Sequence, residues 1–143
     1  MTLDSLNHEF LASHDFLSNL GISIVEETAG KIVLDLPHRP ALTNPGNDVM
    51  QGGIVATIID HAAGAALRTT FASRPVPLHA TTDLTVSYLR PARSDLRATG
   101  TVLRAGGTMG VVRTTVENAE TDLIAEGRVS LAIKRDQEMP GTA

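Results

Sequence analysis

Asp60 is the residue in this sequence that most needs a chemical explanation, because it is an acid within an otherwise apolar segment. Residues 51–68 begin with Gln51, Gly52 and Gly53 and continue mainly with Ala, Ile, Leu and Val, without proline. This composition favours a helix that is buried on every side. Burying an unpaired carboxylate is costly, so we expect Asp60 either to pair with a base or to take part in a reaction.

The start of the predicted helix suits a reaction in which negative charge develops on an oxygen. A helix N-terminus presents N–H groups without intrahelical partners and a partial positive charge. Gly52 and Gly53 let the backbone approach a substrate closely. Asp60 could serve as a general base toward water or as a nucleophile, and the sequence leaves both roles open. Gly64 lies one turn later on the same face and leaves room beside the carboxylate.

The composition excludes several classes of protein. A chain of 143 residues suits a single domain, residues 1–143, with a core of ordinary size. Twelve Lys and Arg against sixteen Asp and Glu give a net charge of −4, without the basic cluster of a nucleic-acid-binding protein. The absence of cysteine excludes disulfides and thiolate chemistry. The histidines show no metal-binding spacing, so we predict no metal site.

The chain also lacks the usual signals for export or membrane insertion. Its first residues form neither a basic nor an apolar leader, so we predict a cytoplasmic protein. The apolar segment before Arg68 is shorter than the ~20 residues that cross a bilayer, and it contains Asp60 and His61. We therefore predict no membrane partner.

The remaining sequence predicts a sheet that surrounds this helix. Apolar residues at helical spacing predict an N-terminal helix over residues 1–20, and alternation predicts a hairpin over residues 22–36. The central helix is predicted over residues 51–72. Four further strands with short turns follow within residues 79–133, and residues 136–143 are predicted to be a flexible tail. The simplest way to bury the helix is an antiparallel sheet wrapped around it, an α+β fold.

Five motifs in this order resemble the hotdog-fold thioesterases of the phenylacetic-acid-degradation (PaaI-like) family. The resemblance covers residues 22–133. Its motifs are Asn44-Pro45-Gly46, Gln51-Gly52-Gly53, Asp60, Asp83 with Tyr88-Leu89-Arg90-Pro91-Ala92, and Arg104-Ala105-Gly106-Gly107-Thr108. The resemblance implies a hotdog fold and an enzyme that hydrolyses acyl-CoA to free acid and CoA. It also implies no cofactor, since coenzyme A enters as part of the substrate.

The resemblance assigns roles to residues around the reacting centre. It implies that the Gly52 N–H polarises the thioester carbonyl and that Asp60 is the general base or nucleophile. Asn44 matches a polar loop residue that reaches the catalytic water or carboxylate, and Thr81 matches a hydroxyl that faces the reacting centre. Gln51 replaces the histidine usual in the family; because it has no titrating proton, we expect it only to position the substrate.

Other matched positions imply a coenzyme A site. Its arginines are suited to phosphates, which guanidinium binds in a bidentate manner, and we rank Arg90 first. The arginines could equally be solvated surface groups, and Asn44 could simply form a turn before Pro45. The predicted site comprises Gly53, Asp83, Tyr88, Arg90, Pro91, Arg93, Arg104, Gly106, Gly107 and Thr108.

The spacing of Gly52 and Asp60 predicts a dimer. Eight residues of helix separate them, which is about 12 Å, so one thioester cannot contact both in the same chain. Two central helices running antiparallel about a two-fold axis would bring Gly52 of one chain opposite Asp60 of the other. We predict an obligate homodimer with two interface sites. The resemblance implies the same and allows a dimer of dimers, a homotetramer.

Two other functions remain compatible with the sequence. A hydratase or dehydratase of acyl thioesters can share the fold, but it would need a catalytic histidine, for which His61 is the nearby candidate. A non-catalytic acyl-CoA-binding protein would keep the pocket without turnover. Asp60 would then be a structural carboxylate paired with an interface Arg or Lys. For the thioesterase we expect an aryl or medium-chain acyl group in a pocket of Leu, Val, Ala and Met side chains.

Overall fold

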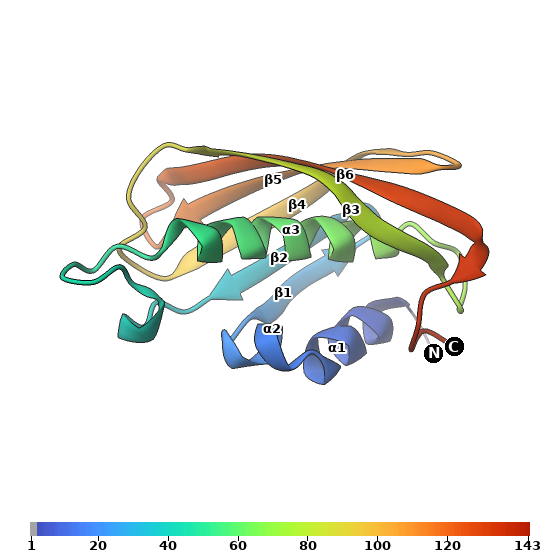
Figure 1. Ribbon diagram of the computed structural model, residues 1–143, viewed down its shortest axis with the longest axis horizontal. Helices are drawn as coiled ribbons and strands as arrows, with labels where there is room; N and C mark the ends of the chain where they lie inside the picture. Colours follow the sequence, from blue (N-terminus) through green and yellow to red (C-terminus); the bar gives the residue numbers. More distant parts are fainter. Residues whose placement is uncertain (1–2) are drawn as a thin grey trace.

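One antiparallel sheet curves around one long helix in the computed structural model, which describes residues 3–143 (Figure 1). Residues 1 and 2 of the predicted N-terminal helix lie outside the described residues. The elements in chain order are α1 (Leu3–Ser13), α2 (Asp15–Asn19), β1 (Ser23–Thr28), β2 (Lys31–Leu36), the 3-10 helix η1 (Pro40–Leu42), α3 (Gly52–Arg68), β3 (Pro77–Tyr88), β4 (Leu96–Ala105), β5 (Met109–Asn118) and β6 (Leu123–Glu138).

The six strands form a single sheet in the order β1-β2-β4-β5-β6-β3, and all neighbouring strands are antiparallel. The sheet packs against α3 through β2, β3, β4, β5 and β6, while α1 and α2 lie beneath the helix and β1 (Figure 1). The predicted α+β fold, a sheet wrapped around one central helix, is confirmed. No helix within residues 3–143 is long and apolar enough to span a bilayer.

Glycines on the strands allow the sheet to approach α3 closely. A Cβ atom on Gly100 would lie 2.9 Å from the backbone oxygen of Ala62. A Cβ atom on Gly127 would lie 2.5 Å from Cγ2 of Ile59. Both distances are shorter than van der Waals contact, so the backbone of the sheet itself forms the surface on which the helix rests.

The N-terminal helix and the central helix both differ from their predicted limits. The N-terminal helix is broken in two, because the side chain of His14 accepts a hydrogen bond from Leu17 N and caps α2. The central helix, predicted over residues 51–72, begins at Gly52 and ends at Arg68. Gln51 is therefore the N-cap residue, and its backbone angles are extended (φ −59°, ψ 135°).

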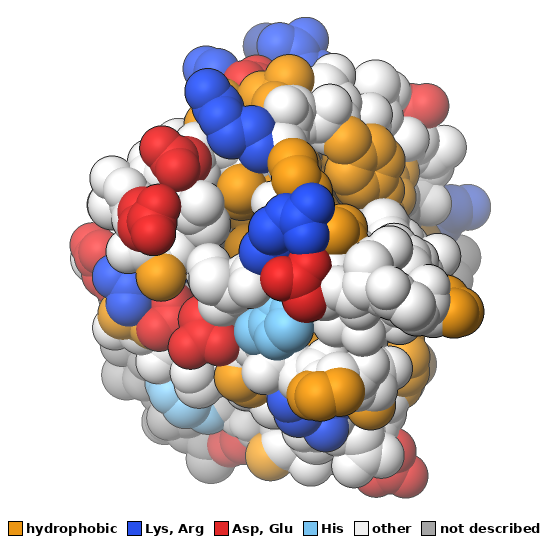
Figure 2. Space-filling model, turned by 90° about the vertical axis from the view of Figure 1, so that its left-hand side faces the viewer, with side chains coloured by type: hydrophobic (Ala, Val, Ile, Leu, Met, Phe, Trp, Pro, Cys, Tyr) orange, Lys and Arg blue, Asp and Glu red, His pale blue; other side chains and the backbone are white. Residues whose placement is uncertain are grey.

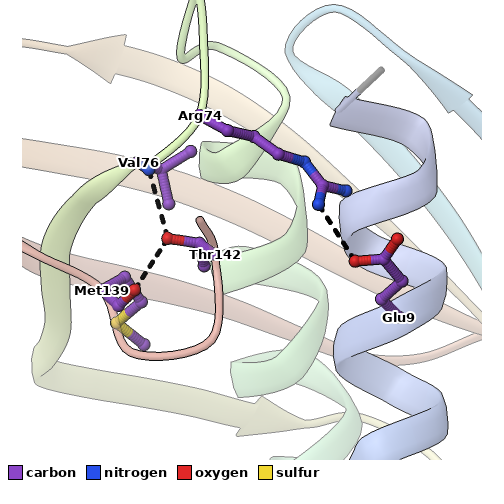
Figure 3. A network of polar contacts seen from close by, with 5 residues as sticks. All are labelled: Glu9, Arg74, Val76, Met139 and Thr142. Atoms are coloured by element: carbon purple, nitrogen blue, oxygen red, sulfur yellow. Dashed lines mark hydrogen bonds and ion pairs between the residues drawn. The ribbon is translucent and has the colours of Figure 1, made fainter. Parts of the chain in front are cut away.

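The C-terminal residues have fixed partners, which differs from the flexible tail expected over residues 136–143. Strand β6 continues to Glu138, and Thr142 is 1% exposed. The Thr142 hydroxyl accepts a hydrogen bond of 3.2 Å from Val76 N and donates one of 2.7 Å to Met139 O (Figure 3). In the same region Arg74 donates to Glu9 on α1 at 3.0 Å. The two chain ends are thus tied to the segment between α3 and β3.

We expect Gly100→Ala to lower the free energy of unfolding by about 1–3 kcal/mol, because the added methyl group would overlap the helix backbone. Urea denaturation followed by circular dichroism measures the change. Gly107→Ala is a matched control, since a Cβ there would meet nothing within 4 Å. Equal stabilities of the two variants would show that the sheet can move away from α3 without cost.

Candidate active site

Asp60 and Thr81 meet between α3 and β3. Asp60 is half-buried on the strip of α3 that the sheet leaves uncovered, and the Thr81 hydroxyl donates a 2.7 Å hydrogen bond to Asp60 Oδ1. Within residues 3–143 Asp60 forms no ion pair. Its second oxygen is therefore available to a water molecule or to a ligand, so the carboxylate is placed to act as a general base or a nucleophile.

The start of α3 forms the second part of the candidate site. The Tyr88 hydroxyl donates a 2.6 Å hydrogen bond to Gly52 O, and a Cβ on Gly52 would lie 3.4 Å from the Tyr88 ring. The N–H groups of Gly52 and Gly53 belong to the first turn, where no intrahelical acceptor exists. Gln51 is exposed and its Oε1 lies over Gly53, 2.7 Å from the position of a Cβ. Tyr88 thus fixes the turn that would polarise a carbonyl.

The predicted catalytic residues line two different cavities of the chain. One cavity of about 320 Å³ contains Asp60 and Thr81. Another of about 370 Å³ contains Asn44 and Gly52, beside Tyr88. Within one chain, therefore, the structure brings Asp60 to Thr81 and Gly52 to Asn44, but it does not bring the two pairs together.

Part of the predicted coenzyme A site lies at the same end as Gly52. Tyr88, Arg90 and Pro91 line the cavity that contains Gly52, and Arg90 donates to Leu123 O at 2.8 Å. Arg93 is exposed and forms an ion pair with Asp48. Figure 2 views this end and shows basic, acidic and histidine side chains close together beside apolar ones. This face offers guanidinium groups to a ligand at its surface.

The other predicted coenzyme A residues lie elsewhere. Arg104 lies near the end of β4, and Gly106, Gly107 and Thr108 form the turn that follows it. This turn is at the end of the molecule opposite the start of α3 (Figure 1). Arg135 donates to the carbonyl oxygens of this turn at 3.0 Å. Asp83 is exposed on β3, with its carboxylate 3.5 Å from the Thr85 hydroxyl. The predicted ligand site is therefore divided between the two ends of the subunit.

Sequence analysis missed a buried polar cluster beside Asp60. Arg68 is 3% exposed and lines the same cavity. Its Nε donates to Asn7 Oδ1 at 2.7 Å, its Nη1 lies 3.2 Å from His79 Nε2, and its guanidinium stacks 4.2 Å from the centre of the Phe10 ring. The sequence did contain a signal for this cluster. Asp60, Gly64 and Arg68 follow one another at a spacing of four residues, which places them on one face of the helix.

Two of the three histidines that line this cavity, His61 and His79, are neutral at physiological pH. Burial, followed by the charges of Arg68 and His14, lowers the pKa of His61 to about 3. Burial also lowers the pKa of His79, although a hydrogen bond to Pro77 O opposes the shift. His61 stacks on Phe10 with ring centres 6.1 Å apart. This environment is that of a packing residue, and the side chains of residues 6–143 give His61 no carboxylate partner. The same residues contain no cluster of His, Asp and Glu suited to a metal ion.

Sequence comparison identifies the family. A sequence model of the thioesterase superfamily matches residues 47–125, more than half of the chain, from the loop before α3 into β6. The chain belongs to the thioesterase superfamily. The predicted thioester hydrolase is thereby confirmed at the level of the superfamily.

Named relatives agree with this assignment. A Halobacterium salinarum protein, whose name marks it as a presumed esterase, is 41% identical over 92% of this chain and 93% of its own length. Human acyl-coenzyme A thioesterase 13 is 29% identical over 75% of this chain and 76% of its own. The acyl-CoA thioesterase type of function is thus supported for the family.

Solved structures show the same fold. A thioesterase-superfamily protein aligns with a TM-score of 0.80 and 32% identity over 92% of this chain and 97% of its own. The Escherichia coli PaaI protein of the phenylacetic acid degradation operon has a TM-score of 0.83 at 21% identity, over 98% of this chain and 95% of its own. The resemblance to hotdog thioesterases inferred from the motifs is confirmed.

Burial of His61 predicts that the fold loses stability in acid. Between pH 6.5, its ordinary pKa, and about 3, the unfolded chain binds a proton that the folded chain does not. The free energy of unfolding should therefore fall as the pH falls through this range, by up to about 1.4 kcal/mol per pH unit. Urea denaturation between about pH 7.5 and pH 5 measures this slope.

His61→Leu should make the free energy of unfolding less dependent on pH, because the leucine does not titrate. Thr101→Leu, which introduces a leucine at an exposed position of β4 and removes no titrating group, is the control and should keep the wild-type slope. If His61→Leu kept the wild-type slope as well, other groups would account for the acid sensitivity.

Proposed function

We propose that this protein hydrolyses acyl-CoA thioesters as a homodimer, with each active site formed by Asp60 of one subunit and the start of α3 of the other. The observation that carries the proposal is the division of the site. Asp60 with Thr81 and Gly52 with Tyr88 occupy separate cavities along one helix. A second subunit placed antiparallel would complete both halves by a single two-fold rotation.

The uncovered part of α3 supports this arrangement. Residues 61–68 are all buried, whereas Gly53 is exposed and Ala56 and Thr57 are only half-buried. Helix α1 contacts the C-terminal half of α3 through Asn7 and leaves the N-terminal half free. A helix this rich in Ala and Ile gains stability when a partner removes the remaining apolar surface from water.

Strand β3 offers a second contact surface. It pairs only with β6 and ends the sheet, and nearly all of its residues from Ala80 onward are exposed, including the apolar Leu84 and Tyr88. An open edge with exposed apolar side chains is a natural template for pairing with another strand. Pairing of β3 with its copy would continue the sheet across the dimer. It would also place the partner's start of α3 near Asp60.

In this site Asp60 accepts a proton from water, and the water oxygen attacks the thioester carbon. The carbonyl oxygen becomes negative and accepts a hydrogen bond from the Gly52 N–H of the partner subunit. The C–S bond then breaks, and the CoA thiolate takes the proton from Asp60. Direct attack by Asp60 through a mixed anhydride uses the same geometry. Thr81 orients the carboxylate in either case.

The dimer would also unite the two parts of the predicted coenzyme A site. Arg90 and Arg93 lie at the end of the subunit that holds the start of α3, and Arg104 lies at the opposite end. Antiparallel subunits would place Arg104 of one chain toward Arg90 of the other. Guanidinium groups from both subunits could then hold the phosphates of one coenzyme A.

We expect Asp60→Asn to reduce kcat by roughly two or more orders of magnitude with little change in affinity for acyl-CoA, because the amide cannot accept the proton. Release of free CoA from hexanoyl-CoA and phenylacetyl-CoA, detected with a thiol reagent, measures the rate. Asp136→Asn, at an exposed position of β6, is the control. Absence of CoA release by the wild type would favour the non-catalytic alternative.

Gly52→Pro should remove the polarising N–H and little else. Gly52 is the first helical residue, where proline is accepted, and the extended Gln51 suits a following proline. We expect activity to fall by about 100-fold. Gly52→Ala introduces a Cβ at the same contact with Tyr88 but keeps the N–H, so it should retain most activity.

Mixed dimers test whether the site is shared. A heterodimer of an Asp60→Asn subunit with a Gly52→Pro subunit would contain one site with both changes and one site with neither. Subunits mixed by co-expression at equal amounts should therefore recover about a quarter of wild-type activity. A mixture no more active than the separate variants would show that each site lies within one chain.

A further inference from the structure

The cavity that contains Asp60 has a charged end. Arg68 closes it at the far end of α3 and is 3% exposed. Its Nη2 atom is buried and has no hydrogen-bond partner among the described residues. Unsatisfied buried donors on a charged group are costly, so they call for a ligand or another acceptor. Among the side chains of residues 6–143, Arg68 also forms no ion pair.

The Arg68 side chain points back toward Asp60. Its Nη1 lies 3.3 Å from the position of a Cβ on Gly64, so the guanidinium occupies space that any side chain at residue 64 would narrow. Gly64 follows Asp60 by one turn, a rise of about 6 Å along the helix. The carboxylate and the guanidinium therefore face the same cavity with room for a short acyl chain between them.

The charge of Arg68 is only partly offset by the protein. His61 and His79 are neutral because burial lowers the pKa of each. Burial lowers the pKa of Arg68 itself to about 10, and Glu27 opposes this shift. Asn7 lies between the two groups, because its Oδ1 accepts the Arg68 hydrogen bond and its Nδ2 donates to Glu27 at 3.3 Å. Arg68 thus remains a cation at neutral pH, with a neutral amide between it and the carboxylate.

We propose that Arg68 selects acyl groups that end in a carboxylate, so that the preferred substrates are CoA thioesters of short dicarboxylic acids. The proposal rests on the function proposed above and names its substrate class. With the thioester carbon beside Asp60, a terminal carboxylate reaches the guanidinium when the acyl chain has about four to six carbons. Two charge-assisted hydrogen bonds would satisfy Nη2 and neutralise the buried cation.

Other acyl groups fit this cavity less well. A hydrocarbon chain would leave the guanidinium buried, charged and incompletely hydrogen-bonded. The cavity wall is also more polar than the apolar lining expected from the sequence, because His61, Arg68 and His79 join Asp60 and Thr81 there. A hydroxyl group would supply an acceptor but no negative charge. A carboxylate supplies both.

Wild-type protein tests the proposal directly with substrates of equal length. The value of kcat/KM for adipyl-CoA should exceed that for hexanoyl-CoA and for 6-hydroxyhexanoyl-CoA by at least about 10-fold. Hydrolysis of hexanoyl-CoA at an equal or higher rate than adipyl-CoA would overturn the inference and leave the proposed function intact. Equal use of the hydroxyl-ended substrate would overturn it too, because the charge would be irrelevant. Failure to release CoA from all three would instead contradict the proposed function.

Arg68→Met keeps an unbranched apolar side chain of similar length to the aliphatic stem of arginine and removes the charged guanidinium. We expect the ratio of kcat/KM for adipyl-CoA to kcat/KM for hexanoyl-CoA to fall by about 100-fold, whatever the change in overall activity. Arg68→Lys keeps the charge and should retain part of the adipyl-CoA preference. Arg128→Met, at an exposed position of β6, is the matched control and should not alter the preference.

Far-UV circular dichroism shows whether the variants fold. If Arg68→Met unfolds, Arg68→Lys and the wild-type substrate comparison still decide the question. Parallel losses of adipyl-CoA and hexanoyl-CoA hydrolysis in a folded Arg68→Met protein would overturn the inference, because they would show that Arg68 supports the site without selecting the acyl group.

Discussion

The structure depends on the close packing of α3 into the concave face of the sheet. This packing requires backbone rather than side chains at the contact, which Gly100 and Gly127 provide. It also requires a helix of small and branched apolar residues, because any larger group on the sheet side would push the layers apart. The only strip of α3 free of this constraint faces away from the sheet, and the polar residues of the helix lie on that strip.

Different segments of the chain cover the two halves of this strip, and each segment supplies different side chains to it. Near its start the strip is uncovered, and Thr81 from β3 and Tyr88 at the end of β3 hold the groups suited to thioester chemistry. Near its end α1 covers it, and Asn7 and Phe10 enclose Arg68. One end of this strip is therefore enclosed by α1, and the other end is open. The binding mode that we propose, with the acyl group inside and coenzyme A outside, would match this gradient of burial.

The covering segments come from both ends of the chain. Phe10 from α1 and Met139 beyond β6 line the same cavity as Asp60. The hydrogen bonds of Thr142 hold the C-terminal residues against Val76, and the contact between Arg74 and Glu9 joins the same loop to α1. Segments far apart in sequence thus determine the shape of this cavity. Variation in these segments would alter this cavity without disturbing the sheet and helix that carry Asp60 and Thr81.

The sequence alone determined the order of elements, the sheet around a central helix, the thioesterase family and the unusual acid at Asp60. These features are local or periodic: alternation marks strands, composition marks the buried helix, and ordered motifs mark the family. Only the tertiary structure decided that Gly52 and Asp60 line separate cavities, that residues 136–143 fold back, and that Arg68 is buried beside Asp60. These depend on contacts between residues distant in sequence, such as Arg68 with Asn7 and Thr142 with Val76, which no local pattern encodes.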